Sequence, residues 1–269
     1  MALFSRCRVD PGSDISLDDL DPGATPGASR ENGEQALPEL SRKLGTLVQQ
    51  LWADQRYALL VILQGMDASG KDGTVRKVFS GVNPLGCRVF SFKRPTPEEL
   101  GHDFLWRVHA RCPRRGEVVV FNRSHYEDVG IVRVHDLVPK KVWSARFDQI
   151  NDFERLLHAS GTRILKFFLH ISRAEQKERL LERIHDPLKA WKMELGDIEE
   201  RAHWSSYMQA YSEAISRCST DHAPWLVVPA DKKWYRNLVV AQAIIHELES
   251  LDLRPPPPHF DPAAVHVPD

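Results

Sequence analysis

A glycine-rich segment in the first third of the chain has the residue types and the spacing of a phosphate-binding loop. Residues 65–74 read GMDASGKDGT and fit G-x-x-x-x-G-K, between a continuous apolar run and a helical pattern, which is the context that this motif requires. Glycines let the backbone turn N–H groups inward, the helix amino terminus adds about half a positive charge, and Lys71 can reach a transferring phosphoryl group. A glycine-rich turn with a surface lysine is the alternative. The residues expected to bind phosphate beside Lys71 are Gly65, Ala68, Ser69, Gly70, Asp72, Gly73 and Thr74.

The residue after the lysine departs from the usual pattern. A serine or threonine that helps to hold Mg²⁺ normally stands there, but this chain has Asp72, and Thr74 comes two positions later. Asp67, inside the loop, offers the hard carboxylate oxygen that Mg²⁺ prefers. The same carboxylate could instead stabilise the turn by bonding to its own backbone.

A second polar segment follows the third expected strand. Residues 118–129 read VVVFNRSHYEDV, and the carboxyl ends of parallel strands face the ligand crevice. The strand ends in Asn122, where a Walker B strand usually ends in aspartate. Arg123 would project into the site, where a guanidinium can clamp phosphate through two hydrogen bonds. Glu127 and Asp128 are either metal ligands or a solvated acidic pair.

A basic segment later in the chain predicts a lid. Residues 171–193 contain six Lys or Arg against four Asp or Glu, and a His-Asp-Pro sequence at 185–187 ends the helical pattern. P-loop kinases carry a mobile, arginine-bearing lid at this point, which excludes water during transfer. A surface helix with i,i+4 ion pairs is the alternative. The side chains expected to bind a polyanion are Arg173, Lys177, Arg179, Arg183, Lys189 and Lys192, with Lys232, Lys233 and Arg236 as an extension.

The elements that must position these segments alternate between strand and helix patterns. Apolar runs predict strands at 58–65, 86–92, 117–122, 162–171 and 225–230, and helical spacing predicts helices at 37–52, from 71, from 96, at 142–157, from 172 and at 234–248. Strands separated by helices imply right-handed crossovers. The expected fold is therefore α/β, a five-stranded parallel sheet with helices on both faces and a helical lid at about 171–195.

The two ends of the chain differ in composition from the core at 34–253. Residues 1–33 are expected to form a partly flexible arm, mobile or loosely docked, because most of them are Pro, Gly, Asp and other polar residues. Residues 254–269 hold six prolines, which cannot continue a helix.

The composition excludes several classes of protein. The chain has 269 residues, 42% apolar and 27% charged, with a net charge of −1, so long-range attraction cannot gather a polyanion and any such partner must meet a local basic patch. No apolar run is long enough to span a membrane, and the amino terminus lacks the apolar region of a signal peptide. The four cysteines and 12 histidines show no metal-binding spacing, and His125 is expected to make only a supporting hydrogen bond. We expect a cytoplasmic protein with no DNA, RNA or membrane partner.

The ordered set of motifs resembles the family-2 polyphosphate kinases over essentially the whole core. The segments that carry the resemblance are GMDASGKDGT, FKRPTPEEL, DFLWRVH, FNRSHYEDV, ILKFFLHIS and APWLVVPADKKWYRN. The resemblance implies a P-loop kinase fold like that of thymidylate and adenylate kinases. It also implies Mg²⁺-dependent, reversible phosphoryl transfer between inorganic polyphosphate and adenine or guanine nucleotides, in a homodimer or homotetramer. The segment NRSHYEDV is similar to that of the subclass accepting AMP as well as ADP.

The resemblance carries roles over to particular residues. Asp67 matches the loop aspartate near Mg²⁺, Lys71 the phosphate lysine and Arg123 the arginine after the third strand, with transfer by direct in-line displacement. The basic positions near the phosphates match Arg76, Lys77, Lys93 and Arg94. Members that prefer ADP carry aspartate at the position of Asn122. Because this chain has an amide there, the carboxylates at 127 and 128 are the ones expected to bind the metal instead. Without the resemblance, the residues indicate only a P-loop phosphotransferase. The alternatives are an ATP-dependent mononucleotide kinase and a non-catalytic module that binds a nucleotide or polyanion.

Overall fold

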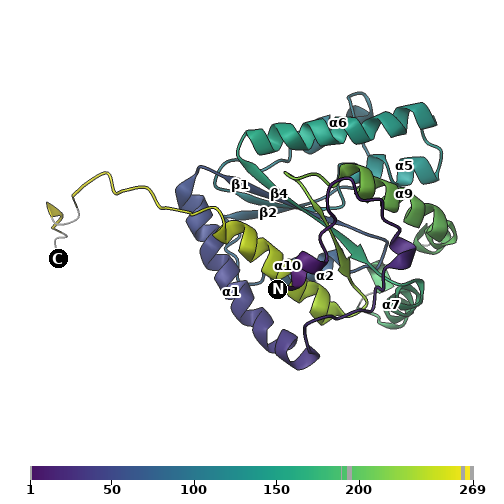
Figure 1. The fold of residues 1–269 in the computed structure, drawn as a ribbon, viewed down its shortest axis with the longest axis horizontal. Coiled ribbons are helices and arrows are strands. Elements are labelled where there is room, and N and C mark those ends of the chain that lie inside the picture. Colours follow the sequence, from purple (N-terminus) through teal and green to yellow (C-terminus); the bar gives the residue numbers. More distant parts are fainter. Residues whose placement is uncertain (1, 189, 193–195, 262–263, 267–269) are drawn as a thin grey trace.

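The apolar runs form one parallel sheet in the computed structural model, which describes residues 2–188, 190–192, 196–261 and 264–266. The strands are β1 (Ala58–Gln64), β2 (Cys87–Ser91), β3 (Val118–Asn122), β4 (Thr162–His170) and β5 (Trp225–Pro229). They pair in the order β2-β3-β1-β4-β5, with every pair parallel. This confirms the five expected strands, each within one residue of its expected bounds. Figure 1 shows strands in the middle of the domain, with helices on either side.

Two layers of helices cover the sheet. The helices are α1 (Arg30–Asp54), α2 (Lys71–Val78), α3 (Pro97–Leu100), α4 (Trp106–His109), α5 (Ile131–Val134), α6 (Lys140–Ala159), α7 (Arg173–His185), α8 (Gly196–Glu200), α9 (Trp204–Cys218) and α10 (Lys233–Glu249). Alternate residues of β1 point to opposite faces: Leu59 and Val61 pack in the core formed with α1 and α10, whereas Leu60 and Ile62 pack in the core formed with α6 and α9. Burial on both faces explains why this strand is apolar throughout.

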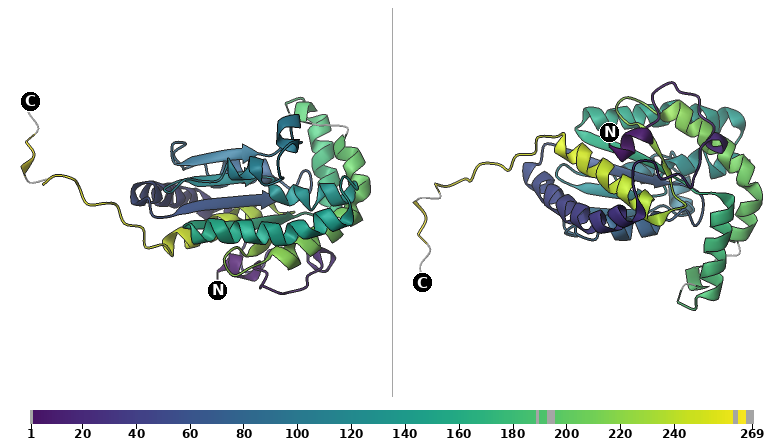
Figure 2. Two further views of the ribbon diagram at one scale, coloured as in Figure 1. Left: turned by 90° about the horizontal axis from the view of Figure 1, so that it is seen from above. Right: turned by 60° about the horizontal axis from the view of Figure 1, so that its bottom comes forward.

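The two helices expected to begin after residues 96 and 172 do begin there, each with its capping hydrogen bond. Thr96 and Glu99 form a reciprocal capping box, although the helix that follows has only 4 residues. The hydroxyl of Ser172 accepts a hydrogen bond from the N–H of Glu175 at 3.0 Å and begins α7. Figure 2 shows α7 and α9, in green, at the end of the sheet opposite the C-terminal tail. None of the described helices is long and apolar enough to cross a membrane.

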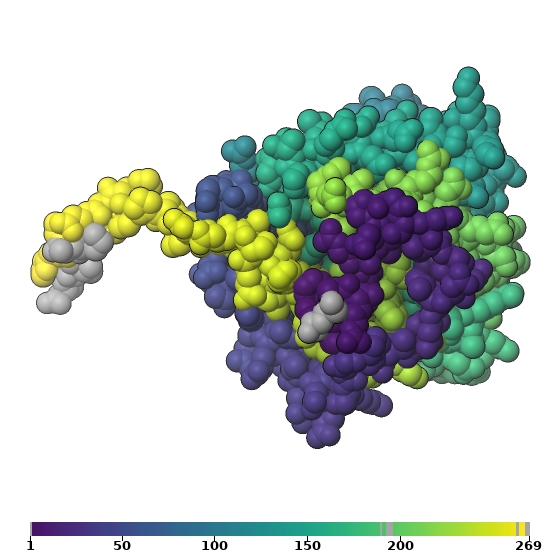
Figure 3. Space-filling view, in the orientation of Figure 1, coloured from purple at the N-terminus to yellow at the C-terminus, as the bar shows by residue number. Residues whose placement is uncertain are grey.

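The N-terminal arm differs from the expected mobile or loosely docked segment. Helix α1 begins at Arg30, so the arm ends before residue 33, and Figure 3 shows it lying across the surface of the domain. Leu17 is fully buried, and its N–H and that of Ile15 each donate to a serine hydroxyl of α9 at 3.0 Å. Arg8 forms an antiparallel bridge with Leu226 of β5. A few well-placed apolar residues and satisfied backbone groups thus outweigh the polar composition.

The packing of the arm predicts that truncating its buried leucine side chain destabilises the protein. Leu17→Ala should lower the free energy of unfolding by roughly 2–5 kcal/mol, because it leaves a cavity at a fully buried position. Leu20→Ala, at a position 41% exposed, is the matched control and should cost about 0.5 kcal/mol or less. Equilibrium urea denaturation measures both. Equal small losses would mean that the arm does not contribute to the core in solution.

Candidate active site

Residues 65–70, called the phosphate loop below, join β1 to α2. Their backbone has conformations that few residue types adopt. Gly65, Ala68 and Gly70 have φ angles of 144°, 61° and 101°, in the region that favours glycine. A Cβ at position 70 would lie 1.9 Å from Nη1 of Arg236, and a Cβ at position 65 would lie 2.7 Å from the carbonyl oxygen of Leu169. Conformation therefore favours glycine at both positions, and at position 65 a backbone oxygen also leaves no room for a Cβ.

The side chain of Lys71 is almost completely buried at the start of α2. Its Nζ donates to the carbonyl oxygens of Gly65 at 2.7 Å and Met66 at 3.2 Å. Burial, together with the charge of Arg123, lowers the pKa of Lys71 to about 8, although the nearby carboxylate of Asp67 opposes this shift. An anion bound here would favour the charged ammonium, so the lysine is suited to bind phosphate.

Arg123 lies beside the loop, as the sequence predicts. Its Nη2 donates to Oδ1 of Asp67 at 2.6 Å. Its φ of 63° is unusual for a residue with a side chain, yet its N–H still donates to the carbonyl of Leu63 at 3.0 Å. Burial disfavours the charge, but Glu127 and Asp67 raise the pKa of Arg123 above its usual value. The turn after β3 thus fixes a charged guanidinium at the edge of the loop.

The ends of β1 and β3 hold two more polar side chains of the site. Nδ2 of Asn122 donates to Oδ1 of Asp72 at 2.5 Å, which ties the end of β3 to the first turn of α2. Nε2 of Gln64 donates to Oε1 of Glu127 at 2.7 Å. The expected residues of both motifs are therefore brought together by neighbouring strand ends.

Asp128 is hydrogen-bonded to helix α6 and not to the residues of the loop. Its carboxylate and its carbonyl accept hydrogen bonds from Nη1 of Arg146 on α6, at 3.1 and 2.9 Å. Burial raises the pKa of Asp128 to about 6, while Arg146 opposes the rise. Among the described residues, no group of three His, Cys, Asp or Glu side chains is placed to hold a metal ion. The expected set of Asp67, Glu127 and Asp128 is therefore not assembled as a three-carboxylate site.

Arg179 has a different role from the one expected, because it does not face a polyphosphate channel. The residue is 6% exposed. Its guanidinium donates to the carbonyls of Ala68 and Ser69 at 2.9 and 3.0 Å, and to those of Ala230 and Asp231 at 2.7 and 2.9 Å. Nε donates to a carboxylate oxygen at position 175, 2.9 Å away. The spacing of α7 turns this residue inward, so the shared helix face with Arg183 is not a solvated array.

The remaining basic residues stay predictions. Those on the surface are Arg76, Lys77, Lys93, Arg94, Arg173, Lys177, Lys232 and Lys233. Arg183 is half-buried and lies 3.6 Å from a carboxylate oxygen of Asp197, and Nζ of Lys233 lies 3.6 Å from one of Glu182. Lys189 and the side chain of Lys192 lie outside the described residues. Exposed cations along α7 are compatible with the expected lid.

Two further residues hold the phosphate loop in place. Nε2 of Gln176 donates to the carbonyl of Asp67 at 3.0 Å. Arg236 is not an extension of a surface channel but is buried and donates to the carbonyl of Ser69 at 3.0 Å. The position of Gln176, three residues before Arg179 on one helix face, is the signal that could have identified it.

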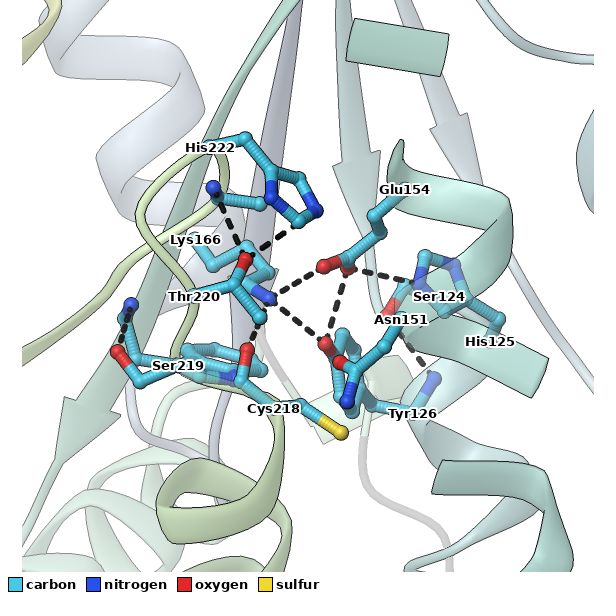
Figure 4. Close-up of polar contacts among 12 residues, drawn as sticks. Ser124, His125, Tyr126, Asn151, Glu154, Lys166, Cys218, Ser219, Thr220 and His222 are labelled. Carbon is cyan, nitrogen blue, oxygen red and sulfur yellow. Dashed lines mark hydrogen bonds and ion pairs between the residues drawn. The ribbon is translucent and has the colours of Figure 1, made fainter. Parts of the chain in front are cut away.

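A buried network supports the turn after β3, as Figure 4 shows. Nζ of Lys166 donates to Glu154 at 2.5 Å, to the hydroxyl of Tyr126 at 2.8 Å and to the carbonyl of Cys218 at 2.7 Å. Glu154 also accepts from the same tyrosine at 2.9 Å and contacts Nε2 of His125 at 3.2 Å. The charged pair is fully buried. His125 makes the supporting contact expected of it, in the turn that carries the carboxylate at position 127.

Comparisons with known proteins agree with the motifs. The model of the family polyphosphate kinase 2 (PPK2) matches residues 27–255. The chain belongs to this family. It is 51% identical over 259 residues to an AMP/ADP-polyphosphate phosphotransferase of Meiothermus ruber, covering 95% of this chain and 96% of that one. It is 48% identical over 240 residues to an ADP-polyphosphate phosphotransferase of Rhodopseudomonas palustris, covering 85% and 83%.

Solved PPK2 structures show the same fold. The crystal structure of polyphosphate kinase 2 from Arthrobacter aurescens superposes with a TM-score of 0.94 at 44% identity, over 98% of this chain and 95% of that one. A second PPK2 structure, from Pseudomonas aeruginosa, gives a TM-score of 0.82 at 30% identity, over 87% and 50% of the two chains. The expected α/β fold is confirmed.

The buried pair beneath the site yields a stability test. Lys166→Met should lower the free energy of unfolding by roughly 3–5 kcal/mol, because it leaves the carboxylate of Glu154 buried without its counter-charge. The double variant Lys166→Met with Glu154→Leu removes both charges and should recover much of this loss. Chemical denaturation of the two variants measures the difference. A single variant as stable as the parent protein would contradict the assignment of an ion pair.

Proposed function

We propose that this protein transfers phosphoryl groups from inorganic polyphosphate to AMP and to ADP, giving ADP and ATP. The observation that carries the proposal is the phosphate loop with Lys71 and Arg123 beside it, in a chain 51% identical to an AMP/ADP-polyphosphate phosphotransferase over 95% of its length. Asn122 and the NRSHYEDV segment, which resemble the AMP-accepting subclass, favour AMP as an acceptor in addition to ADP.

The charged groups of the site support direct transfer without a covalent intermediate. The ammonium of Lys71 and the guanidinium of Arg123 can neutralise and orient phosphoryl oxygens, and the loop backbone can cradle them, so that donor and acceptor meet in line.

The residues also fit Mg²⁺, which we include in the proposal. Mg²⁺ usually takes one or two protein carboxylates and completes its shell with water and substrate phosphates, so a three-carboxylate cage is not required. Asp67 and Glu127 are both close enough to affect the pKa values of Lys71 and Arg123, and they are the residues that would hold the ion. When bound, the ion would neutralise charge on the phosphates.

Product analysis tests the proposed function. AMP, ADP or GDP is mixed with polyphosphate and Mg²⁺, and products are separated by chromatography. We expect AMP to give ADP first and ATP later, and EDTA to stop the reaction. AMP with ATP as the only donor is the control, because turnover there without polyphosphate turnover would support an ATP-dependent mononucleotide kinase. ADP turnover without AMP turnover would contradict only the acceptor range.

The pKa of Lys71 predicts how phosphate binding depends on pH. With a pKa of about 8, the free protein loses the ammonium charge of Lys71 as the pH rises. Affinity for tripolyphosphate, corrected for the ionisation of the ligand itself, should therefore fall about fourfold between pH 7.0 and 8.5. Titration calorimetry at both values measures this. Lys71→Ala should bind weakly at both, and an unchanged affinity in the parent protein would remove Lys71 from phosphate binding.

A further inference from the structure

Two buried arginines meet at one carbonyl of the phosphate loop. Arg179 comes from α7 and Arg236 from the first turn of α10, and they are 6% and 3% exposed. Nη1 of each donates to the carbonyl oxygen of Ser69 at 3.0 Å. Two guanidinium groups from helices far apart in the sequence therefore hold the same peptide of the loop.

Arg236 also touches the point where the loop becomes a helix. A Cβ at Gly70 would lie 1.9 Å from its Nη1, and a Cβ at Gly73 would lie 3.5 Å from its Nη2. The guanidinium thus packs directly against the loop backbone. No other side chain in the described ranges comes as close to the Cβ position at residue 70.

The charges of the two arginines are balanced differently. Arg179 donates to the carboxylate of Glu175, whereas the other bonds of Arg236 go to the neutral amide oxygen of Asn237, at 3.1 Å from Nε and 2.9 Å from Nη2. In the part of the chain that the structure describes, Arg236 has no carboxylate within ion-pair distance. Burial, and secondly the charge of Arg179, lower the pKa of Arg236 to about 9.

An unpaired buried charge is costly for stability. Moving an ion out of water carries a large penalty unless a counter-ion compensates for it. The loop backbone lies against this guanidinium, and the loop is the place where the proposed function puts phosphate groups. An anion there is attracted through a medium of low dielectric constant, in which a charge acts more strongly than in water.

We propose that Arg236 is a positioning residue that strengthens phosphate binding by holding the Ser69 carbonyl and by placing an unpaired positive charge behind the loop. This inference rests on the proposed function only in taking the loop as a phosphate site. The bound phosphate supplies the negative charge that the protein itself does not provide for Arg236. The residue acts through the loop backbone and does not touch the transferred group.

Tripolyphosphate binding to three variants of the full chain tests this proposal. Arg236→Met removes the charge at similar length and should weaken binding at least about tenfold, as expected for a lost charged interaction. Arg236→Lys keeps the charge and should remain within about threefold of the parent protein. The melting temperature of ligand-free Arg236→Met should equal or exceed that of the parent, because the Ser69 carbonyl keeps its bond from Arg179 and an unpaired charge is gone.

Arg163→Met is the matched control for the loss of one positive charge. Arg163 pairs with Glu247 at 2.6 Å at the amino end of β4, the opposite end of the sheet from the loop, and its replacement should leave tripolyphosphate binding unchanged. Three results with the variants would each overturn the proposal: parental affinity in Arg236→Met, an affinity of Arg236→Lys as low as that of the methionine variant, or a binding loss in Arg236→Met accompanied by a lower melting temperature.

The same measurements separate this inference from the proposed function. A parent protein that binds tripolyphosphate but transfers nothing to AMP or ADP would contradict the function and leave the role of Arg236 intact. A parent protein that transfers phosphate while Arg236→Met keeps its full affinity would contradict only the role of Arg236. A parent protein that fails to bind tripolyphosphate overturns the inference.

Discussion

The orientation of three consecutive peptide groups in the phosphate loop is the constraint on which the site depends. The carbonyls of Asp67, Ala68 and Ser69 accept hydrogen bonds from side chains of α7 and α10. In a trans peptide the C=O and N–H bonds point in opposite directions. Drawing these carbonyls towards α7 and α10 therefore turns the N–H groups of the same peptides to the other side of the loop, where that of Ser69 donates to the carbonyl of Met66 at 3.1 Å. The helices behind the loop thus set the direction in which its donors face.

The sheet and the loop could be predicted from the sequence because their signals are local. An uninterrupted apolar run marks β1, and the two glycines and Lys71 mark the turn and the helix start that follow it. The polar side chains after β3 were also predictable, because parallel strands bring their carboxyl ends to one edge. In each case the pattern and the structural requirement lie within about ten residues.

The side of α7 that faces the protein could not be predicted in the same way. A run of arginines and glutamates is typical of a solvated helix, and Arg179 is buried only because loop carbonyls and the end of β5 supply acceptors for its guanidinium. The pair of Lys166 and Glu154 is likewise assembled from a strand and a neighbouring helix. The docking of the arm was missed for the opposite reason, since its average composition concealed the few apolar residues that enter the core, among them the fully buried Leu17. These outcomes depend on tertiary contacts that composition and spacing do not encode.

The bonds of Arg179 reach both the loop and the chain after β5, which restricts how α7 can move relative to the sheet. A rotation of the whole of α7 would break the bonds to Ala68, Ser69, Ala230 and Asp231 together. Any hinge must therefore lie beyond this residue, towards the His-Asp-Pro sequence where the helix ends. The part of α7 up to Arg179 is thereby fixed to the loop, whereas these bonds do not hold its last turns.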